Sequence, residues 1–175
     1  LERIDMAIRL VQWLGERTTR ESPAKDLPQA ARGYLDDGSF ADWARLTLRT
    51  ADPLGSLDQA YKTLGKLVAE SRDKNSETFA TMLKDWTSAD SKADAVVAVE
   101  EILARVVAPL AESTPVLVIL LDGMSGAVFH ELVADISGSD WMSICPADRG
   151  DLAVGLATLP SLTAAARTSF FCGEL

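Results

Sequence analysis

The chain has 175 residues, 47% of them hydrophobic and 25% charged, which is typical of a globular protein. The 26 acidic side chains outnumber the 17 basic ones. The resulting net charge of −9 argues against a surface that holds nucleic acid by non-specific phosphate contacts, because such contacts need clustered Lys and Arg. A phosphate substrate bridged by a bound cation stays compatible with this charge.

The N-terminus and the cysteines favour a cytoplasmic protein without membrane contact. Four of the first nine residues are charged, unlike a signal peptide or a membrane span. The longest apolar run is far shorter than the roughly 18 residues that a transmembrane helix needs. Cys145 and Cys172 lack metal-ligand spacing, so we expect free thiols, with a disulfide between the two as the alternative.

Residues 1–114 are predicted to be helical. Apolar residues recur there at the spacing of one helix face, and proline and glycine separate the segments. Ser39 is positioned as an N-cap. We expect the tryptophans and tyrosines of this region to be core residues, and we find no catalytic pattern among them. The predicted helices span residues 4–14, 38–50, 56–72, 75–86 and 92–112.

The last third of the sequence has a different pattern. Residues 116–121 are all Val, Ile or Leu, which predicts a strand buried on both faces, as in a parallel sheet. A helix near 125–136 and further strands near 141–145 and 152–158 follow. Alternating strands and helices predict a parallel sheet with right-handed crossovers.

The expected fold class is therefore α/β. An all-α domain over residues 1–114 precedes the first βαβ portion of a parallel sheet over residues 115–175. His130, the single histidine, lies on the predicted helix near 125–136 but off its apolar face, so we expect it at the surface.

Asp122 ends the predicted strand and is followed at once by Gly123. A carboxylate at the end of a buried strand is costly unless it is paired, hydrogen-bonded or bound to a metal. It either caps the next helix or binds a positive group. Because ligands of parallel sheets bind beyond the carboxyl ends of the strands, the second interpretation is favoured.

Thr163 follows a turn at Pro160 and Ser161 and begins a helix of small residues. A hydroxyl there faces free backbone N–H groups and about half a positive charge from the helix dipole, an environment that suits phosphate. The alternative is an ordinary N-cap threonine.

Together these motifs resemble the alkaline phosphatase superfamily, and more closely its PglZ branch from the BREX phage-defence systems. The helical region looks like the part that precedes the PglZ domain in those proteins. The stretches that carry the resemblance are ARGYLDDGSFADWAR at 31–45, AYKTLGKLVAESR at 60–72, VLVILLDGMS at 116–125, Trp141, and LPSLTAAARTSFFCG at 159–173.

The resemblance implies a phosphohydrolase with two divalent metal ions, zinc being the expected metal. Asp122 would be a metal ligand, and Thr163 a metal-bound nucleophile that becomes transiently phosphorylated. Arg167, one turn after Thr163, would bind a phosphate oxygen, unless it is a structural or solvated arginine. The family setting implies phage defence, a phosphate ester or nucleic-acid substrate, and other defence proteins as partners.

The sequence supplies too few ligands for such a centre, since each metal needs about three protein ligands. We therefore expect a truncated PglZ protein that is inactive by itself and part of a phosphodiesterase when complete. The alternative is a non-catalytic scaffold of a defence complex. Unpaired strand edges predict self-association. If Asp122 and Thr163 serve one metal, the strands near 115–121 and 152–158 run parallel and their ends converge.

Overall fold

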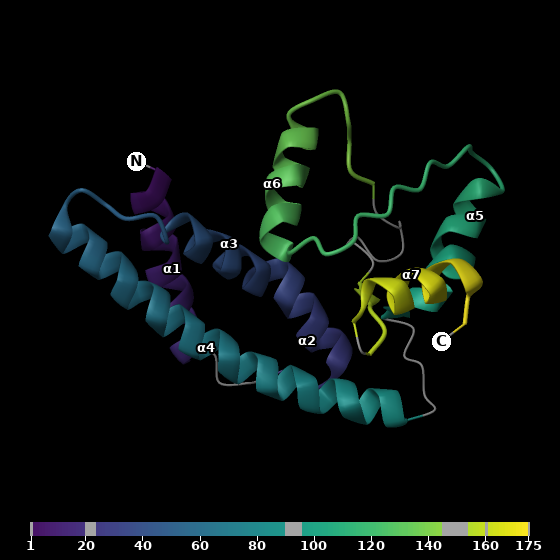
Figure 1. Cartoon of the computed structure of the whole chain (residues 1–175), viewed down its shortest axis with the longest axis horizontal. Helices are drawn as coiled ribbons and strands as arrows, with labels where there is room; N and C mark the ends of the chain where they lie inside the picture. Colours follow the sequence, from purple (N-terminus) through teal and green to yellow (C-terminus); the bar gives the residue numbers. More distant parts are fainter. Residues whose placement is uncertain (1, 20–23, 90–95, 145–153, 160, 175) are drawn as a thin grey trace. The chain divides into compact units, whose positions relative to one another are not determined.

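The computed structural model shows two compact units (Figure 1). The first unit contains Leu1–Asp90 and Ser125–Met142, and the second contains Ser91–Met124 and Ser143–Leu175. The domain boundary expected at residue 114 stays a prediction. The structure describes residues 2–19, 24–89, 96–144, 154–159 and 161–174.

The first unit is helical throughout its described elements. The mixed helix that runs from Leu27 to Thr47 begins at Asp26, whose carboxylate accepts a hydrogen bond from the Gln29 backbone N–H at 2.9 Å. Its elements are α1 (Glu2–Thr19), α2 (Leu27–Gly33), the π-helical turn η1 (Tyr34–Gly38), α3 (Ser39–Thr47), α4 (Gly55–Ser88) and α6 (Gly126–Ser137).

Two sequence predictions for this unit are wrong in detail. Ser39 is not an N-cap, because the chain is already helical before it; its hydroxyl donates to the Leu35 carbonyl at 2.8 Å. The two helices predicted over 56–72 and 75–86 are one helix, α4. The two residues between them are Asp73 and Lys74, and neither is a helix breaker.

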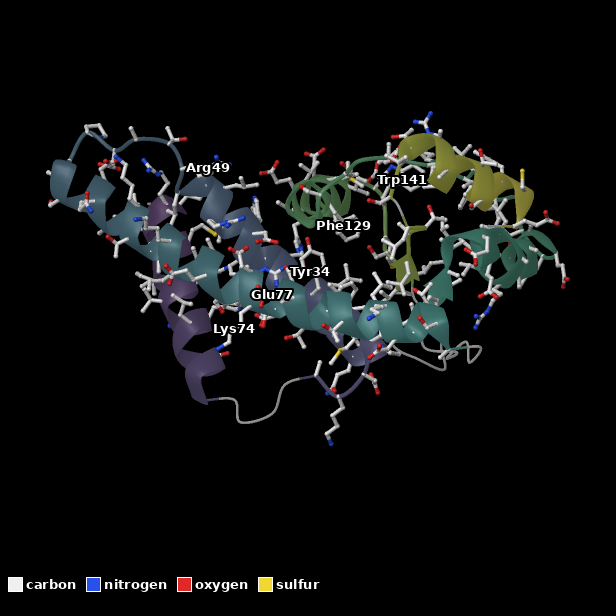
Figure 2. All side chains as sticks on the ribbon, turned by 60° about the horizontal axis from the view of Figure 1, so that its bottom comes forward. Tyr34, Arg49, Lys74, Glu77, Phe129 and Trp141 are labelled. Atoms are coloured by element: carbon white, nitrogen blue, oxygen red, sulfur yellow. The ribbon has the colours of Figure 1, made fainter. Side chains whose placement is uncertain are left out.

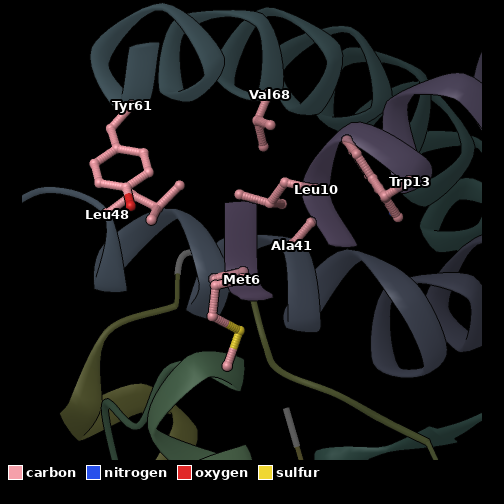
Figure 3. Packing of buried hydrophobic residues seen from close by; sticks show 8 residues of the cluster. Met6, Leu10, Trp13, Ala41, Leu48, Tyr61 and Val68 are labelled. Atoms are coloured by element: carbon pink, nitrogen blue, oxygen red, sulfur yellow. The ribbon is translucent and has the colours of Figure 1, made fainter. Parts of the chain in front are cut away.

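The core of the first unit lies where α1, α3 and α4 meet. Figure 3 shows Leu10 of α1 between Val68 of α4 and Ala41 of α3. Trp13 and Tyr61 are buried in it, which confirms their expected role as core aromatics. The buried cluster consists of Met6, Leu10, Trp13, Ala41, Ala44, Leu48, Tyr61 and Val68.

The second unit holds a minimal parallel sheet. In this sheet Val97 pairs with Gly155 and Ala98 with Leu156, and the Val97 N–H donates to the Val154 carbonyl at 2.9 Å. The single helix predicted over 92–112 is therefore wrong at Val97–Ala98, and its residues 92–95 lie outside the described residues. The elements are β1 (Val97–Ala98), η2 (Val99–Glu101), η3 (Leu103–Val107), α5 (Ala108–Ala111), β2 (Gly155–Leu156) and α7 (Thr163–Cys172).

The predicted strand at 115–121 is not a strand in the structure. The segment has no assigned secondary structure, and its side chains from Val116 to Leu121 are exposed. A strand hydrogen-bonds only to neighbouring strands, and no described segment pairs with this one. The strand near 141–145 is likewise absent over 141–144, and Cys145 lies outside the described residues.

Other predictions for this part of the chain are confirmed. The helix near 125–136 is confirmed as α6, and β2 lies within 152–158, of which 152 and 153 are not described. Cys172 is an exposed free thiol. The fold is mainly helical with a small parallel sheet, a mixed α/β arrangement in the broad sense. No helix in the described part of the chain is long and apolar enough to span a membrane.

Candidate functional site

Asp122 and Arg167 form an ion pair in the second unit. The Arg167 Nε lies 3.5 Å from the Asp122 Oδ2, with 57% of the arginine side chain and 26% of the aspartate side chain exposed. Asp122 is followed by Gly123, whose φ of 70° is readily adopted only by glycine. The structure thus brings together the residues predicted to bind a metal and a phosphate.

Asp122 does not cap the helix that follows it. The N-cap of α6 is Ser125, whose hydroxyl accepts a hydrogen bond from the Val128 N–H at 3.3 Å. The capping interpretation of Asp122 is therefore wrong, and the charge partner that the structure provides is a guanidinium.

Thr163 is the first residue of α7 and is exposed. The N-cap is Leu162, and no side chain caps the helix, so the interpretation of Thr163 as an N-cap is also wrong. Arg167 lies four residues later, on the same face of the helix one turn on. Asp122 therefore contacts the helix that Thr163 begins.

The sequence predicted that the ends of two strands converge, but the contact between Asp122 and α7 does not arise in this way. Because 115–121 is not a strand, Asp122 is not at the end of a sheet strand; it reaches α7 through the guanidinium of Arg167. The roles of Asp122, Thr163 and Arg167 as metal ligand, nucleophile and phosphate ligand stay predictions.

The described residues do not by themselves make up a metal centre. Among them, no group of three or more His, Cys, Asp or Glu side chains lies close enough together to hold an ion. Asp122 offers one carboxylate, and Arg167 neutralises it. A cation at Asp122 would need ligands beyond those described here, together with the displacement of Arg167.

A polar cluster in the first unit was missed at the level of sequence. The Ser39 Oγ lies 2.7 Å from the His130 Nε2, and the His130 ring stacks on Trp43 at 6.3 Å between centroids. Trp43 Nε1 donates to the Glu131 carboxylate at 2.9 Å. The expectation of His130 at the surface is thus wrong: it joins α6 to α3. No local pattern relates two residues 91 positions apart.

This cluster is structural rather than catalytic. A serine hydroxyl within reach of a histidine resembles an activated nucleophile, but Ser39 is only 1% exposed and its hydroxyl already donates to the Leu35 carbonyl. A substrate therefore has no access to it. The pair positions α6 on α3.

Tyr34 and Gly126 form a second contact between the same two regions. Burial first, and the Asp42 carboxylate second, raise the pKa of the Tyr34 hydroxyl, while the Gly126 N–H donates to it. A Cβ at Gly126 would lie 2.7 Å from the Ser39 Cβ and 2.9 Å from the Tyr34 hydroxyl, so the approach requires glycine. Tyr34 and Phe129, both labelled in Figure 2, come from the two elements that meet here.

Comparison with known proteins adds no relative: the chain matches no family model, no curated protein and no solved structure.

Proposed function

We propose that this chain contributes a nucleophile, a phosphate ligand and one metal ligand to a PglZ-type, metal-dependent phosphohydrolase. Its reaction is phosphodiester hydrolysis in the cytoplasm, in bacterial defence against phage and alongside other defence proteins. The sequence stretches 116–125 and 159–173 support this proposal. The observation that carries it is the ion pair that joins Asp122 to Arg167 on the helix begun by Thr163.

In this proposal the Thr163 hydroxyl loses its proton to water and its oxygen attacks the phosphorus atom, forming the new P–O bond while the bond to the leaving oxygen breaks and that oxygen takes up a proton. A water molecule then attacks the phosphothreonine, releases the phosphate product and restores the Thr163 hydroxyl. The N–H groups at the start of α7 and the Arg167 guanidinium stabilise the negative charge on the other phosphate oxygens. Divalent cations, zinc being expected, would lower the pKa of the threonine hydroxyl, with Asp122 as one of their ligands. In this proposal residues 115–121 belong to an alkaline phosphatase-like sheet.

The test is hydrolysis of a chromogenic phosphodiester by the natural protein that contains these residues, with added Zn²⁺ or Mn²⁺. Thr163→Ala and Asp122→Ala should each lower kcat by about 100-fold or more, because one removes the nucleophile and the other a metal ligand. Thr168→Ala is the matched control, since Thr168 is an exposed threonine on the same helix. Wild-type rates in either site variant would overturn the assignment.

The 175 residues assayed alone should show no turnover with either metal, since the described residues hold too few ligands. If the 175-residue chain does hydrolyse the substrate, and the Asp122→Ala variant does so as well, the catalytic residues are not those proposed here.

A second candidate function is a non-catalytic interaction module. An apolar groove between α1 and α4 favours it, because Ile4 and Ile8 are exposed there opposite Leu57 and Leu64. Helical partners bind in grooves of this kind. If this module is the whole function, Ile8→Asp abolishes complex formation in co-purification from the native cells, while Thr163→Ala leaves the biological activity intact.

A further inference from the structure

The Arg167 guanidinium, the group proposed to bind phosphate, faces Asp122 with one of its edges. Arg167 approaches the carboxylate with its Nε, at 3.5 Å from Oδ2. Bidentate recognition of a phosphate uses two parallel N–H bonds from one edge of the guanidinium. Asp122 lies at one of the two edges through which a guanidinium can bind a phosphate in this way, and its negative charge opposes a second anion at the same group. Carboxylate and phosphate therefore compete for Arg167.

Both side chains are exposed enough for this competition to be reversible. More than half of the Arg167 side chain and a quarter of the Asp122 side chain are exposed, so the pair is screened and weak rather than locked. Arg167 can rotate away from Asp122 without leaving a buried charge behind. This rotation costs only the Coulomb attraction of a single partly exposed ion pair.

We propose that Asp122 regulates phosphate binding at Arg167: the carboxylate holds the guanidinium back, and neutralisation of its charge releases it. This rests on the proposed function, in which Arg167 binds phosphate. A cation taken up at Asp122 would neutralise the carboxylate in the same way, so that cation and phosphate favour each other's binding. Such coupling is reciprocal, as linkage requires.

The test uses inorganic phosphate and the 175-residue chain without metal. The readout is the NMR signal of the Arg167 side-chain Nε–H, assigned by its disappearance in Arg167→Gln. Asp122→Asn removes the charge with little change in shape. The phosphate dissociation constant should fall about two- to fivefold in this variant, as expected for the loss of a partly exposed ion pair.

Glu101→Gln is the matched control. Glu101 forms an ion pair with Arg105 in the same unit, at 3.1 Å, so this change removes the same charge and leaves the Asp122 pair in place. In this control the phosphate dissociation constant should change only by the small amount that the loss of one negative charge causes. A second neutral variant, Asp122→Ser, should reproduce Asp122→Asn if the carboxylate charge is the cause.

The outcomes separate the two proposals. Equal phosphate affinity in wild type, Asp122→Asn and Glu101→Gln overturns the regulation by Asp122 and leaves Arg167 as a phosphate ligand. No phosphate-dependent shift of the Arg167 signal in any variant overturns both. Tighter binding in Asp122→Asn and Asp122→Ser, but not in Glu101→Gln, supports the regulation.

Discussion

Leu10 and Leu117 carry the same side chain in opposite environments. Leu10, on α1, is completely buried between α3 and α4, whereas 82% of Leu117 is exposed in the segment 115–121. The sequence around Leu117 is the more apolar of the two. Hydrophobicity alone therefore does not decide which region of this chain is buried.

The difference follows from where each region finds its backbone hydrogen bonds. A helix such as α1 makes them within itself, and its apolar face needs only one neighbouring surface. A strand needs other strands beside it before its side chains can be covered. Residues 115–121 have no such neighbour among the described residues, and their side chains stay exposed.

The largest expected effect contrasts these two leucines directly. Leu10→Ala should lower the free energy of unfolding by about 2–5 kcal/mol, because it leaves a cavity in the packed core. Leu117→Ala should change it by less than about 0.5 kcal/mol, as at other exposed positions. Urea denaturation followed by circular dichroism measures both. Equal losses in the two variants would mean that 115–121 is buried in solution.

A smaller loss is expected where α6 packs on α3. Gly126→Ala places a Cβ against the Ser39 Cβ and the Tyr34 hydroxyl, and the helix must move, at a cost of about 1–3 kcal/mol. Gly65→Ala is the control, since nothing lies within 4 Å of its added Cβ inside α4. This control should be neutral or stabilising by up to about 1 kcal/mol. A neutral Gly126→Ala would contradict the close approach of α6.

The N-cap of α6 should contribute about 1 kcal/mol. Ser125→Ala removes the hydroxyl that accepts from the Val128 N–H, so the first turn should fray. Hydrogen exchange at the Val128 amide should become faster, while Ser137→Ala, at the other end of the helix, should leave it unchanged. Unchanged exchange in Ser125→Ala would show that the cap is not formed.

The smallest effect on stability, but a clear one on association, is expected at Ile119. We expect the wild-type chain to self-associate at micromolar concentration through the exposed apolar segment 115–121, and a lysine in this segment to oppose association, as lysines do on exposed strand edges. Ile119→Lys should shift sedimentation velocity profiles toward the monomer without changing the free energy of unfolding. Leu110→Lys, at an exposed leucine of α5, is the control. A monomeric wild type would contradict the prediction.

Much of the helical structure could be predicted because its causes are local. The apolar spacing over 4–14 and 125–136 indicated α1 and α6, since a helix is defined by residues three and four apart. The candidate residues Asp122, Thr163 and Arg167 were also identified from local motifs: Asp122 lies at a turn, Thr163 begins α7 and Arg167 lies one turn later.

Only the tertiary structure decided which of these residues meet. Arg167 lies 45 positions after Asp122 and His130 lies 91 positions after Ser39, and no local pattern encodes either contact. The segment 115–121 shows the same limit, since its sequence specifies a preference for the extended conformation, but a strand forms only where other strands donate and accept its hydrogen bonds. Helical bonds close within four residues, whereas strand bonds and ion pairs depend on segments that the chain must first bring together.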